Sequence, residues 1–415
     1  MRKLYTLVFY LLLPVVLFRL WWRGRRQPGY RHHWRERLGY YTSKPGHRII
    51  WLHAVSVGET RAAQPLVAAL SARYPGYQIV LTQMTPTGRE TALAVYGDQI
   101  EAVYLAYDLP GAVSRFLSHF RPAFGLLMET ELWPNLIHAA HQSNVPLFLV
   151  NARLSERSAL GYAKIRRLIQ PALRQLTHIA AQSIEDANRF RHLGAERITV
   201  CGNIKFDVAL PPEQIMLGQR WRQLLNGRPV IVVGSSRDGE EAMLVRAWAE
   251  MAPVQALLVI VPRHPQRFDE VAAEVARSGM SWARRSQTTE IGHSCQVWLG
   301  DSMGELYAYY AMADLAIIGG GFAELGGQNL IEPCATGCPV IVGPHMYNFA
   351  ETTRLALAAG AAKQVETAED AIMACKNLFT DPASLQDFQT RARQFAAAHT
   401  GATWRTLALL PDPVA

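Results

Sequence analysis

Several common signatures of phosphate and metal chemistry are missing from this sequence of 415 residues. No segment has the form Gly-x-x-x-x-Gly-Lys-[Ser/Thr], so an ordinary P-loop ATPase or GTPase is disfavoured. No Asp-x-Asp pair is present to hold a divalent ion for a sugar diphosphate, and no His/Cys/Asp cluster has metal-ligand spacing. These absences predict a reaction that is independent of metal ions.

Cysteine is also scarce, with five residues in the whole chain. This number fits a reducing compartment and gives no disulfide framework. Cys334 and Cys338 lie four positions apart, but no second Cys/His pair accompanies them, so a zinc site is disfavoured. We expect ordinary small, buried thiols at all five positions. They are Cys201, Cys295, Cys334, Cys338 and Cys375.

Basic residues, by contrast, are in excess, and the net charge is +8 with a pI near 9.3. This balance predicts an anionic partner such as a phospholipid, a nucleotide or a phosphorylated substrate. The length of the chain supports two or three domains, and the apolar half of its residues can form a sizeable core.

Only one long apolar run occurs, from Leu4 to Trp22, and it is interrupted by Pro14 and Arg19. Because about 20 residues are needed to span a bilayer, the run is just long enough. No small-residue cleavage site follows it, which argues against a removed signal peptide. Arginines and aromatic residues follow instead: Arg23, Arg25, Arg26, Arg31, Arg35 and Arg37, interleaved with Trp21, Trp22, Tyr30 and Trp34.

We interpret residues 1–22 as a membrane anchor and residues 23–48 as a basic, aromatic segment at an interface of anionic phospholipid headgroups. Arginines on the C-terminal side of the anchor predict that the rest of the chain lies in the cytoplasm. The alternative is an interfacial or buried helix that never crosses the membrane.

Beyond residue 48, short apolar strands alternate with helix-like stretches, which is typical of parallel βαβ sheets. The expected strands of the first half are Arg48–Val55, Gln78–Met84, Ala102–Ala106, Ala123–Met128, Val145–Val150, Thr177–Ala181 and Arg197–Cys201. Those of the second half are Pro229–Gly234, Gln255–Val261, Gln296–Leu299, Asp314–Ile318 and Pro339–Val342.

This alternation predicts an α/β protein of two doubly wound, Rossmann-like domains that face each other across a cleft. We place the first domain at residues 49–206 and the second at 229–381, with a linker at 207–228 that contains Pro211-Pro212 and a polar, helix-like piece. Residues 382–415 form a C-terminal helical segment.

The most informative segment is glycine-rich and runs from Gly319 to Pro333. It joins a strand-like run to a helix-like run, so backbone N–H groups around Gly319–Gly321 are expected to meet an anion. Asn329 and Glu332 lie one helical turn apart and can face the same ligand. The glycine spacing departs from the dinucleotide fingerprint, which disfavours a Rossmann oxidoreductase.

In the first half, Ser56, Gly58 and Glu59 follow a strand and open a helix. Glu59 is a candidate general base, and the alternative is an acidic residue that complements the helix dipole.

Further polar residues of the first half also follow predicted strands. Arg89 is expected near a phosphate, although its neighbouring hydroxyls fit helix caps equally well. Glu129 and Glu131 follow an apolar strand and are typical of a site. Lys205 is predicted to pair with an anionic ligand or with Asp207.

Strand ends of the second half carry small, hydroxyl and basic residues that suit a nucleotide. Ser235, Ser236 and Arg237 end one strand, and Arg263 and His264 follow the next. A further turn, residues 300–306, leads into a helix. This convergence favours a nucleotide-donor domain in the second half.

Three segments together resemble the family of 3-deoxy-D-manno-octulosonic acid (Kdo) transferases of lipopolysaccharide synthesis. They are Trp51–Thr60 (WLHAVSVGET), Met128–Asn135 (METELWPN) and Gly319–Pro333 (GGGFAELGGQNLIEP), followed by Pro344–Phe349. The resemblance runs from the anchor to at least residue 360. It implies a GT-B glycosyltransferase fold, with the acceptor on the first domain, the nucleotide-sugar donor on the second, and a final helix that crosses back to the first domain.

The resemblance also implies a metal-independent transfer of Kdo from CMP-Kdo to the tetra-acylated lipid A precursor at the cytoplasmic face of the inner membrane. It implies no cofactor and no nucleic-acid partner. The family's general base corresponds to Glu59. The residues implied to contact CMP are Arg263, His264, Met303, Gly304, Glu305, Asn329, Leu330, Ile331 and Glu332.

Two other functions remain open from the sequence. One is a GT-B enzyme that uses a UDP-sugar on a lipid or glycan acceptor, and the segment Met128–Asn135 argues against it. The other is a membrane-tethered nucleotide-binding module without catalysis, which leaves the motif around Glu59 without a purpose.

Overall fold

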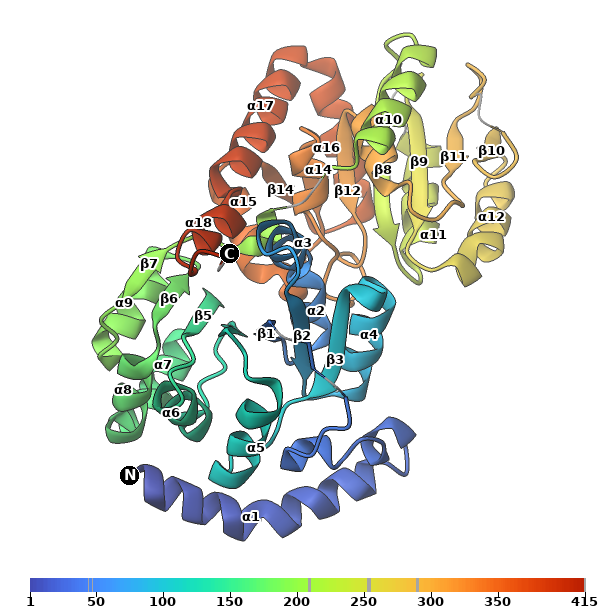
Figure 1. Cartoon of the computed structure of the whole chain (residues 1–415). Coiled ribbons are helices and arrows are strands. Elements are labelled where there is room, and N and C mark those ends of the chain that lie inside the picture. Colours follow the sequence, from blue (N-terminus) through green and yellow to red (C-terminus); the bar gives the residue numbers. More distant parts are fainter. Residues whose placement is uncertain (44, 47, 208–209, 252–254, 289–290, 414–415) are drawn as a thin grey trace. The chain divides into compact units, whose positions relative to one another are not determined.

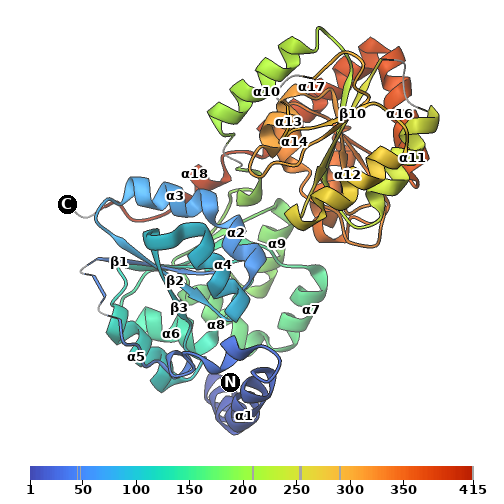
Figure 2. The ribbon, with the colours of Figure 1, turned by 90° about the vertical axis from the view of Figure 1, so that its right-hand side faces the viewer.

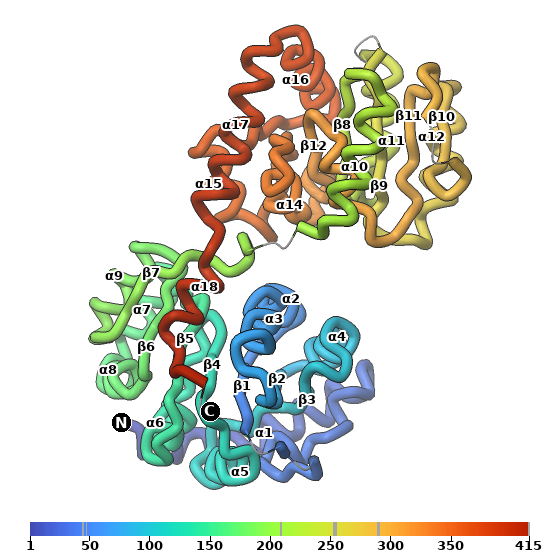
Figure 3. The backbone as a smooth tube through the Cα atoms, turned by 45° about the horizontal axis from the view of Figure 1, so that its top comes forward, coloured from blue at the N-terminus to red at the C-terminus, as the bar shows by residue number. Residues whose placement is uncertain are grey.

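The structure is a computed structural model that describes the chain except residues 44, 47, 208–209, 252–254, 289–290 and 414–415 (Figure 1). It divides into two compact units. The first unit comprises Met1–Asp207 together with Thr400–Ala415, and the second unit comprises Val208–His399. The chain therefore leaves the first unit once and returns to it near the C-terminus, as the tube in Figure 3 shows between α17 (Pro382–His399) and α18 (Ala402–Leu407).

The first unit is built on a parallel sheet of seven strands in the order β3-β2-β1-β4-β5-β6-β7. Nearly every residue of its central strands is buried, as in sheets covered by helices on both faces. The strands are β1 (Ile49–His53), β2 (Gln78–Gln83), β3 (Ile100–Tyr104), β4 (Phe124–Met128), β5 (Leu147–Ala152), β6 (His178–Ala181) and β7 (Ile198–Val200).

Helices cover both faces of this sheet, and each face has its own apolar cluster. One cluster joins the sheet to α5 (Pro110–Phe120), α6 (Pro134–Gln142), α8 (Arg166–Gln175) and α9 (Ile184–Leu193). The other joins it to α2 (Val57–Ala62), α3 (Gln64–Arg73), α4 (Pro86–Tyr96) and α18. The remaining elements are α1 (Arg2–Arg23), α7 (Glu156–Lys164), η1 (Pro28–Arg31), η2 (Glu36–Leu38), η3 (Gly97–Gln99) and η4 (Ile204–Phe206).

The second unit repeats this architecture with the strand order β10-β11-β9-β8-β12-β13-β14, again fully parallel. Its strands are β8 (Val230–Ser236), β9 (Leu257–Pro262), β10 (Trp282–Arg284), β11 (Val297–Leu299), β12 (Leu315–Ile318), β13 (Val340–Val342) and β14 (Ala362–Gln364). Its helices are α10 (Pro212–Leu224), α11 (Glu240–Met251), α12 (Phe268–Arg277), α13 (Leu306–Met312), α14 (Ile331–Ala335), α15 (Ala350–Ala358), α16 (Ala368–Thr380) and α17, with η5 (Pro265–Arg267) and η6 (Tyr347–Phe349).

The expected α/β class with two parallel sheets is confirmed, and each strand expected from the sequence is present. The sequence missed β10 and β14, which form the two edges of the second sheet. Each has three residues, and neither contains an apolar run, because an edge strand is covered by neighbours on fewer sides. Short, half-exposed strands of this kind leave almost no periodic signal.

Residues expected to form a linker belong in part to the second unit. Residues 208–209 lie outside the described residues, but Pro212–Leu224 form α10, which packs against α13. Gly218 permits this close approach, since a Cβ there would lie 2.2 Å from the backbone oxygen of Ala308. Trp221 is buried on the same face against Trp298 and Tyr309. The sequence indicated a helix-like piece in this segment but not its packing against the second unit.

The expected anchor forms the helix α1, which is the only candidate membrane span among the described residues by length and composition. Its mean hydropathy is 1.9 and it has no fully buried residue. Figures 1 and 2 show α1 lying along the surface of the first unit.

Candidate functional site

Most of the predicted site residues of the first unit gather where the order of the sheet reverses. β1 and β4 are neighbours, and their connections run in opposite directions along the sheet. In such sheets ligands bind beyond the carboxyl ends of the strands at this switch point. Glu59 follows β1, and Glu129 follows β4 directly. The fold therefore brings together carboxylates that are 70 positions apart in the sequence.

Glu59 lies in the first turn of α2 and is 9% exposed. Its carboxylate accepts hydrogen bonds from the backbone N–H of Val55 (2.8 Å, Oε2) and from the hydroxyl of Ser56 (3.0 Å, Oε1). The Ser56 oxygen in turn accepts from the backbone N–H of Glu59 at 3.3 Å and so caps α2. Gly58, between them, is exposed.

Burial raises the pKa of Glu59 to about 7, against the hydrogen bonds from Val55 and Ser56 that lower it. The negative charges of Glu129 and Glu131 also raise the pKa and contribute to this value of about 7. A carboxyl group with a pKa near neutrality can take a proton from a substrate at physiological pH. Complementation of the helix dipole and the role of a base are therefore compatible in the same side chain.

Glu129 has a left-handed backbone conformation with φ of 56°. Such a conformation in a non-glycine residue is strained and is often kept where it serves a site. Its carboxylate forms an ion pair with Lys205, with 3.1 Å between Oε1 and Nζ. Lys205 thus pairs with Glu129, which the sequence did not indicate, while the carboxylate of Asp207 accepts hydrogen bonds from the backbone N–H groups of Gly401 (2.5 Å) and Thr403 at the start of α18.

Glu131 accepts a hydrogen bond from the indole N–H of Trp133 at 2.8 Å. Burial raises its pKa, the Trp133 bond lowers it and the charge of Glu129 raises it again. Sequence reasoning missed the histidine beside it. His53 Nε2 lies 3.9 Å from Glu131 Oε2 and has no hydrogen-bond partner in the part of the chain that the structure describes.

His53 is completely buried at the end of β1, and its Nδ1 lies 2.8 Å from the hydroxyl oxygen of Thr82. Burial lowers the pKa of His53 to about 4, so the ring is neutral near pH 7. A polar ring inside an otherwise apolar strand was the signal available in the sequence.

Arg89, expected near a phosphate, is engaged elsewhere in the first unit. Its guanidinium pairs with Glu36 at 2.9 Å and stacks over the ring of Tyr104, 5.1 Å from its centroid. Thr85 caps α4 by accepting a hydrogen bond from the backbone N–H of Gly88 at 3.1 Å. Of the two alternatives for this turn, the structure favours the helix cap.

The second unit has an equivalent switch point between β8 and β12. Ser235, at the end of β8, has φ of 56° and is buried together with Ser236. The turn after β12 crosses it closely, since a Cβ on Gly319 would lie 2.3 Å from the backbone oxygen of Ser235. The glycine-rich segment is therefore needed for close packing of two backbones.

The N–H groups of the glycine-rich turn bind an anion, but that anion is a side chain of the protein. The carboxylate of Glu240 accepts from the backbone N–H groups of Gly320 (2.5 Å), Phe322 (2.9 Å) and Ala323 (3.4 Å). It also accepts from the N–H of Arg237 at 3.0 Å, and it is fully buried. The expectation that these groups face a ligand is wrong for this turn, because Glu240 already occupies them.

Other predicted residues of the second unit do form a polar group together. The amide of Asn329 donates to the Glu332 carboxylate at 3.0 Å, while its own oxygen accepts from the N–H of Ile331 at 3.0 Å. Burial raises the pKa of Glu332, and the Asn329 bond and the charge of Arg263 lower it. The guanidinium of Arg263 therefore lies within electrostatic reach of Glu332. Leu330, Ile331 and Gly321 are buried.

Glu305, at the start of α13, forms an ion pair with Arg285 at 2.8 Å, a partner that the sequence did not indicate. Met303 and Gly304 before it are exposed, and His264 is half-buried. The second unit thus presents at its strand ends a cation at Arg263, paired carboxylates and exposed loop residues. Such groups can bind ribose hydroxyls and an anionic leaving group.

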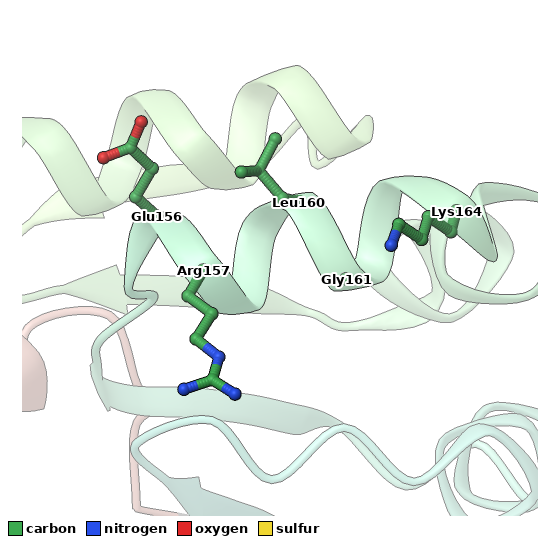
Figure 4. Close-up of a pocket in the computed structure, with 5 residues that line it drawn as sticks. All are labelled: Glu156, Arg157, Leu160, Gly161 and Lys164. Atoms are coloured by element: carbon green, nitrogen blue, oxygen red, sulfur yellow. The ribbon is translucent and has the colours of Figure 1, made fainter.

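A surface hollow elsewhere on the first unit contains none of these residues. Figure 4 shows it along α7, lined by Glu156, Arg157, Leu160, Gly161 and Lys164. We place a candidate site at each of the two switch points, where each unit has a strained backbone residue and buried titratable groups. Among the described residues, no group of three or more His, Cys, Asp or Glu side chains is arranged to hold a metal ion.

Comparisons with known proteins agree with these two units. A family model described as "3-Deoxy-D-manno-octulosonic-acid transferase (kdotransferase)" matches residues 32–208. A second model, described as "Glycosyl transferases group 1", matches residues 282–395. The two matches fall in the first and second unit respectively.

Two relatives are similar over almost the whole chain. A 3-deoxy-D-manno-octulosonic acid transferase of Bordetella pertussis is 44% identical over 429 residues, which cover 99% of both chains. One of Haemophilus influenzae is 36% identical over 420 residues, or 99% of this chain and 98% of that protein.

Among solved structures, the UDP-GlcNAc 2-epimerase from Neisseria meningitidis matches with a TM-score of 0.55 at 13% identity. The match covers 87% of this chain and 99% of the epimerase. At this identity the likeness concerns the fold alone.

Proposed function

The chain belongs to the family of 3-deoxy-D-manno-octulosonic acid (Kdo) transferases, glycosyltransferases of the GT-B fold, and from this premise we propose its reaction. The proposed donor is CMP-Kdo and the proposed acceptor is the tetra-acylated lipid A precursor (lipid IVA) of lipopolysaccharide synthesis. Kdo is transferred with inversion at its anomeric carbon, and CMP is released.

The observation that carries this proposal is the position and pKa of Glu59. A sugar hydroxyl is a poor nucleophile at neutral pH, so a carboxylate must remove its proton as the new bond forms. Glu59 stands at the switch point of the first sheet with a pKa raised to about 7. A carboxyl group with this pKa is deprotonated in a large fraction of molecules near pH 7 and still binds a proton well.

The leaving group departs as a nucleoside monophosphate anion. The charge of Arg263 compensates its negative charge, and Asn329 and Glu332 offer an amide and a carboxylate to ribose hydroxyls. The anomeric carbon passes through an oxocarbenium-like state, by analogy with glycoside hydrolysis. Because attack by the hydroxyl and departure of CMP occur in one displacement, the configuration inverts. No step needs a metal ion.

The acceptor carries phosphate groups and acyl chains, and the proposed enzyme meets it at a membrane. The apolar helix α1 and the exposed arginines that follow it support association with the anionic inner membrane. We place both units on the cytoplasmic side, since the arginines cluster on the C-terminal side of α1.

The test is the substitution Glu59→Gln in the full chain. We expect kcat with CMP-Kdo and lipid IVA to fall by about 10²–10⁴-fold, as is usual for loss of a general base. The affinity for CMP should stay within about twofold, which is about 0.4 kcal/mol, because the proposed CMP-binding residues lie in the second unit.

The matched control is Glu90→Gln, an exposed carboxylate on α4 outside the site. Near-normal turnover of a folded Glu59→Gln variant would contradict the assignment of the base. Product formed from UDP-sugars and not from CMP-Kdo would contradict the assignment of the donor.

A further inference from the structure

The helix α1 has two different faces, although most of its residues are apolar. Eight positions are half-buried and recur every three or four residues: Arg2, Tyr5, Thr6, Phe9, Leu13, Val16, Leu17 and Leu20. Of these, Phe9, Leu13, Val16 and Leu17 pack against the apolar cluster of the first unit. The opposite face is exposed and strongly apolar: Leu4, Leu7, Val8, Leu11, Leu12, Val15, Phe18, Trp21 and Trp22.

Polar contacts fix the beginning of α1 to the body of the first unit. The hydroxyl of Thr6 donates to the side-chain oxygen of Asn135 at 3.0 Å, and Arg2 donates to the same oxygen at 3.4 Å. Tyr5 donates to the buried carboxylate of Asp108. Asp108 in turn accepts from the backbone N–H groups of Asn135 (3.1 Å) and Leu136 (2.7 Å). The beginning of α1 is therefore bound to a network of hydrogen bonds around Asp108 and Asn135.

The other end of α1 is held through η1. Arg31 donates from its guanidinium to the backbone oxygen of Trp21 at 3.4 Å. Gly29 in the same turn packs on Pro86 at the start of α4, since a Cβ on it would lie 2.8 Å from the Pro86 Cβ. Both ends of the helix are therefore tied to the same unit.

This double attachment decides between the two topologies that the sequence leaves open. A helix of 22 residues is about 33 Å long, which is close to the thickness of the hydrocarbon core of a bilayer. If α1 crossed the membrane, Arg2 would emerge on the side opposite the folded units and lose its contact with Asn135. Its docked face would also have to leave the apolar cluster of the first unit.

We propose that α1 lies in the plane of the membrane, docked on the first unit, and inserts its exposed face into the cytoplasmic leaflet of an anionic phospholipid bilayer. The charge around this face fits that partner. Lys3, Arg19, Arg23 and Arg25 are exposed beside it. Arg25 stacks over Trp21 and Trp22, 4.8 Å from each ring, which is a typical arrangement at a headgroup interface.

The docked helix also touches the segment that carries part of the candidate site. Asn135, its main polar partner, belongs to the same METELWPN segment as Glu131 and Trp133. The hydrogen bond between Thr6 and Asn135 thus connects the membrane-bound helix to the segment that carries the carboxylate cluster of the first unit. This sets the depth at which an acceptor embedded in the leaflet meets the cluster.

The first test is the accessibility of residue 3. The five native cysteines are buried, so a cysteine at Lys3→Cys or Arg26→Cys is labelled selectively by a membrane-impermeant maleimide. In the full chain, we expect both positions to be labelled in inverted inner-membrane vesicles and neither in intact spheroplasts. Labelling of Lys3→Cys in spheroplasts, with Arg26→Cys still protected, would show that the helix crosses the membrane and would overturn the proposal.

A second test compares Leu11→Gln with Leu13→Gln, which both lie near the middle of the helix. Leu11 is 69% exposed, so Leu11→Gln should weaken binding to phosphatidylglycerol vesicles by about tenfold and leave the melting temperature unchanged. Leu13 faces the protein, so Leu13→Gln should lower the Tm by about 2–4 °C and bind vesicles nearly as well. A helix that spans the membrane predicts that both variants lose membrane binding equally, and this result would overturn the proposal. Neither test measures turnover, so their failure would leave the proposed reaction standing.

Discussion

The proton affinity of Glu59 is set by opposing interactions with its immediate neighbours. Burial and the charges of Glu129 and Glu131 favour the neutral acid, while the hydrogen bonds from Val55 and Ser56 favour the carboxylate. The outcome, a pKa of about 7, depends on a like charge that can be removed by substitution without touching Glu59 itself.

We therefore expect Glu129→Gln to lower the pKa of Glu59. The substitution removes a negative charge and leaves the Lys205 ammonium, its ion-pair partner, without a counter-charge, and both changes favour the ionised Glu59. The acid limb of the pH profile of kcat/KM should shift below pH 7, and NMR titration of carboxyl-labelled glutamate should report the same shift. Glu90→Gln serves as the control, and an unmoved acid limb would show that Glu129 does not interact with Glu59.

The raised pKa of Glu59 also predicts how stability depends on pH. Between pH 4.5 and about 7 the folded protein binds a proton at Glu59 that the unfolded chain releases, so the free energy of unfolding falls as pH rises. The fall from this group is roughly 3 kcal/mol. Glu59→Gln lacks the titrating group, so its free energy of unfolding does not fall for this reason. Urea unfolding should therefore show that the variant gains stability relative to the parent between pH 4.5 and pH 8. A constant difference across this range would contradict the raised pKa.

Glu240 illustrates a residue whose role the sequence does not reveal. Its N–H partners at Gly320, Phe322 and Ala323 lie some eighty positions away, so no local pattern connects them. The same holds for His53 beside Glu131. Motifs predicted Glu59, Asn329 and Glu332 as site residues, because their hydrogen-bond partners lie within about one turn of the chain. Contacts between distant strand ends can be recognised only once the fold is known.

Glu240→Gln is expected to loosen the glycine-rich turn. One of its oxygens becomes an NH₂ group that faces backbone N–H donors, so at least one buried donor loses its partner, at a cost of about 1–3 kcal/mol in the free energy of unfolding. The affinity for CMP should fall as well, since the turn leads directly to Asn329. Urea unfolding and calorimetric titration with CMP measure the two effects. Glu250→Gln, an exposed site on the same helix, is the control. Equal stability of the two variants would show that Glu240 does not stabilise the glycine-rich turn.

At the level of helices and strands, the sequence predicted the buried strands well because their apolar runs are continuous. It failed where an element is defined by one close contact. The helix α10 was interpreted as a linker, and its docking depends on Gly218, which meets the backbone of α13. The exposed helix α7 offers a direct comparison, because a Cβ added to Gly161 would meet no packing neighbour within 4 Å among the described residues.

The substitutions Gly218→Ala and Gly161→Ala should therefore have opposite effects. At Gly218 the new Cβ lies 2.2 Å from the Ala308 oxygen, so α10 must shift, at a cost of about 1–3 kcal/mol. At Gly161 the methyl group meets open space, and alanine should stabilise the helix by about 0.5–1 kcal/mol. Chemical denaturation measures both values. A neutral or stabilising Gly218→Ala would contradict the packing of α10 described above.

For the molecule as a whole, the consequential feature is that the first unit is discontinuous. The chain forms the second unit entirely from Val208–His399, but the first unit is completed by the last residues, which return to it. Ala402 and Leu407 of α18 lie in the apolar cluster of the first unit, and Asp207 binds the N–H groups that begin this helix. The backbone oxygen of Leu407 also accepts a hydrogen bond from Arg73 at 2.5 Å.

It follows that substitutions in α18 should destabilise the first unit and spare the second. Leu407 is 1% exposed, so Leu407→Ala should lower the free energy of unfolding of the first unit by about 2–5 kcal/mol. Trp404, in the same helix, is 72% exposed, and Trp404→Ala should change it by less than about 0.5 kcal/mol. Hydrogen exchange resolved by segment separates the two units. Faster exchange in β1 and β4 with unchanged exchange in β8 and β12 is the expected pattern, and loss of protection confined to the second unit would show that α18 stabilises that unit instead.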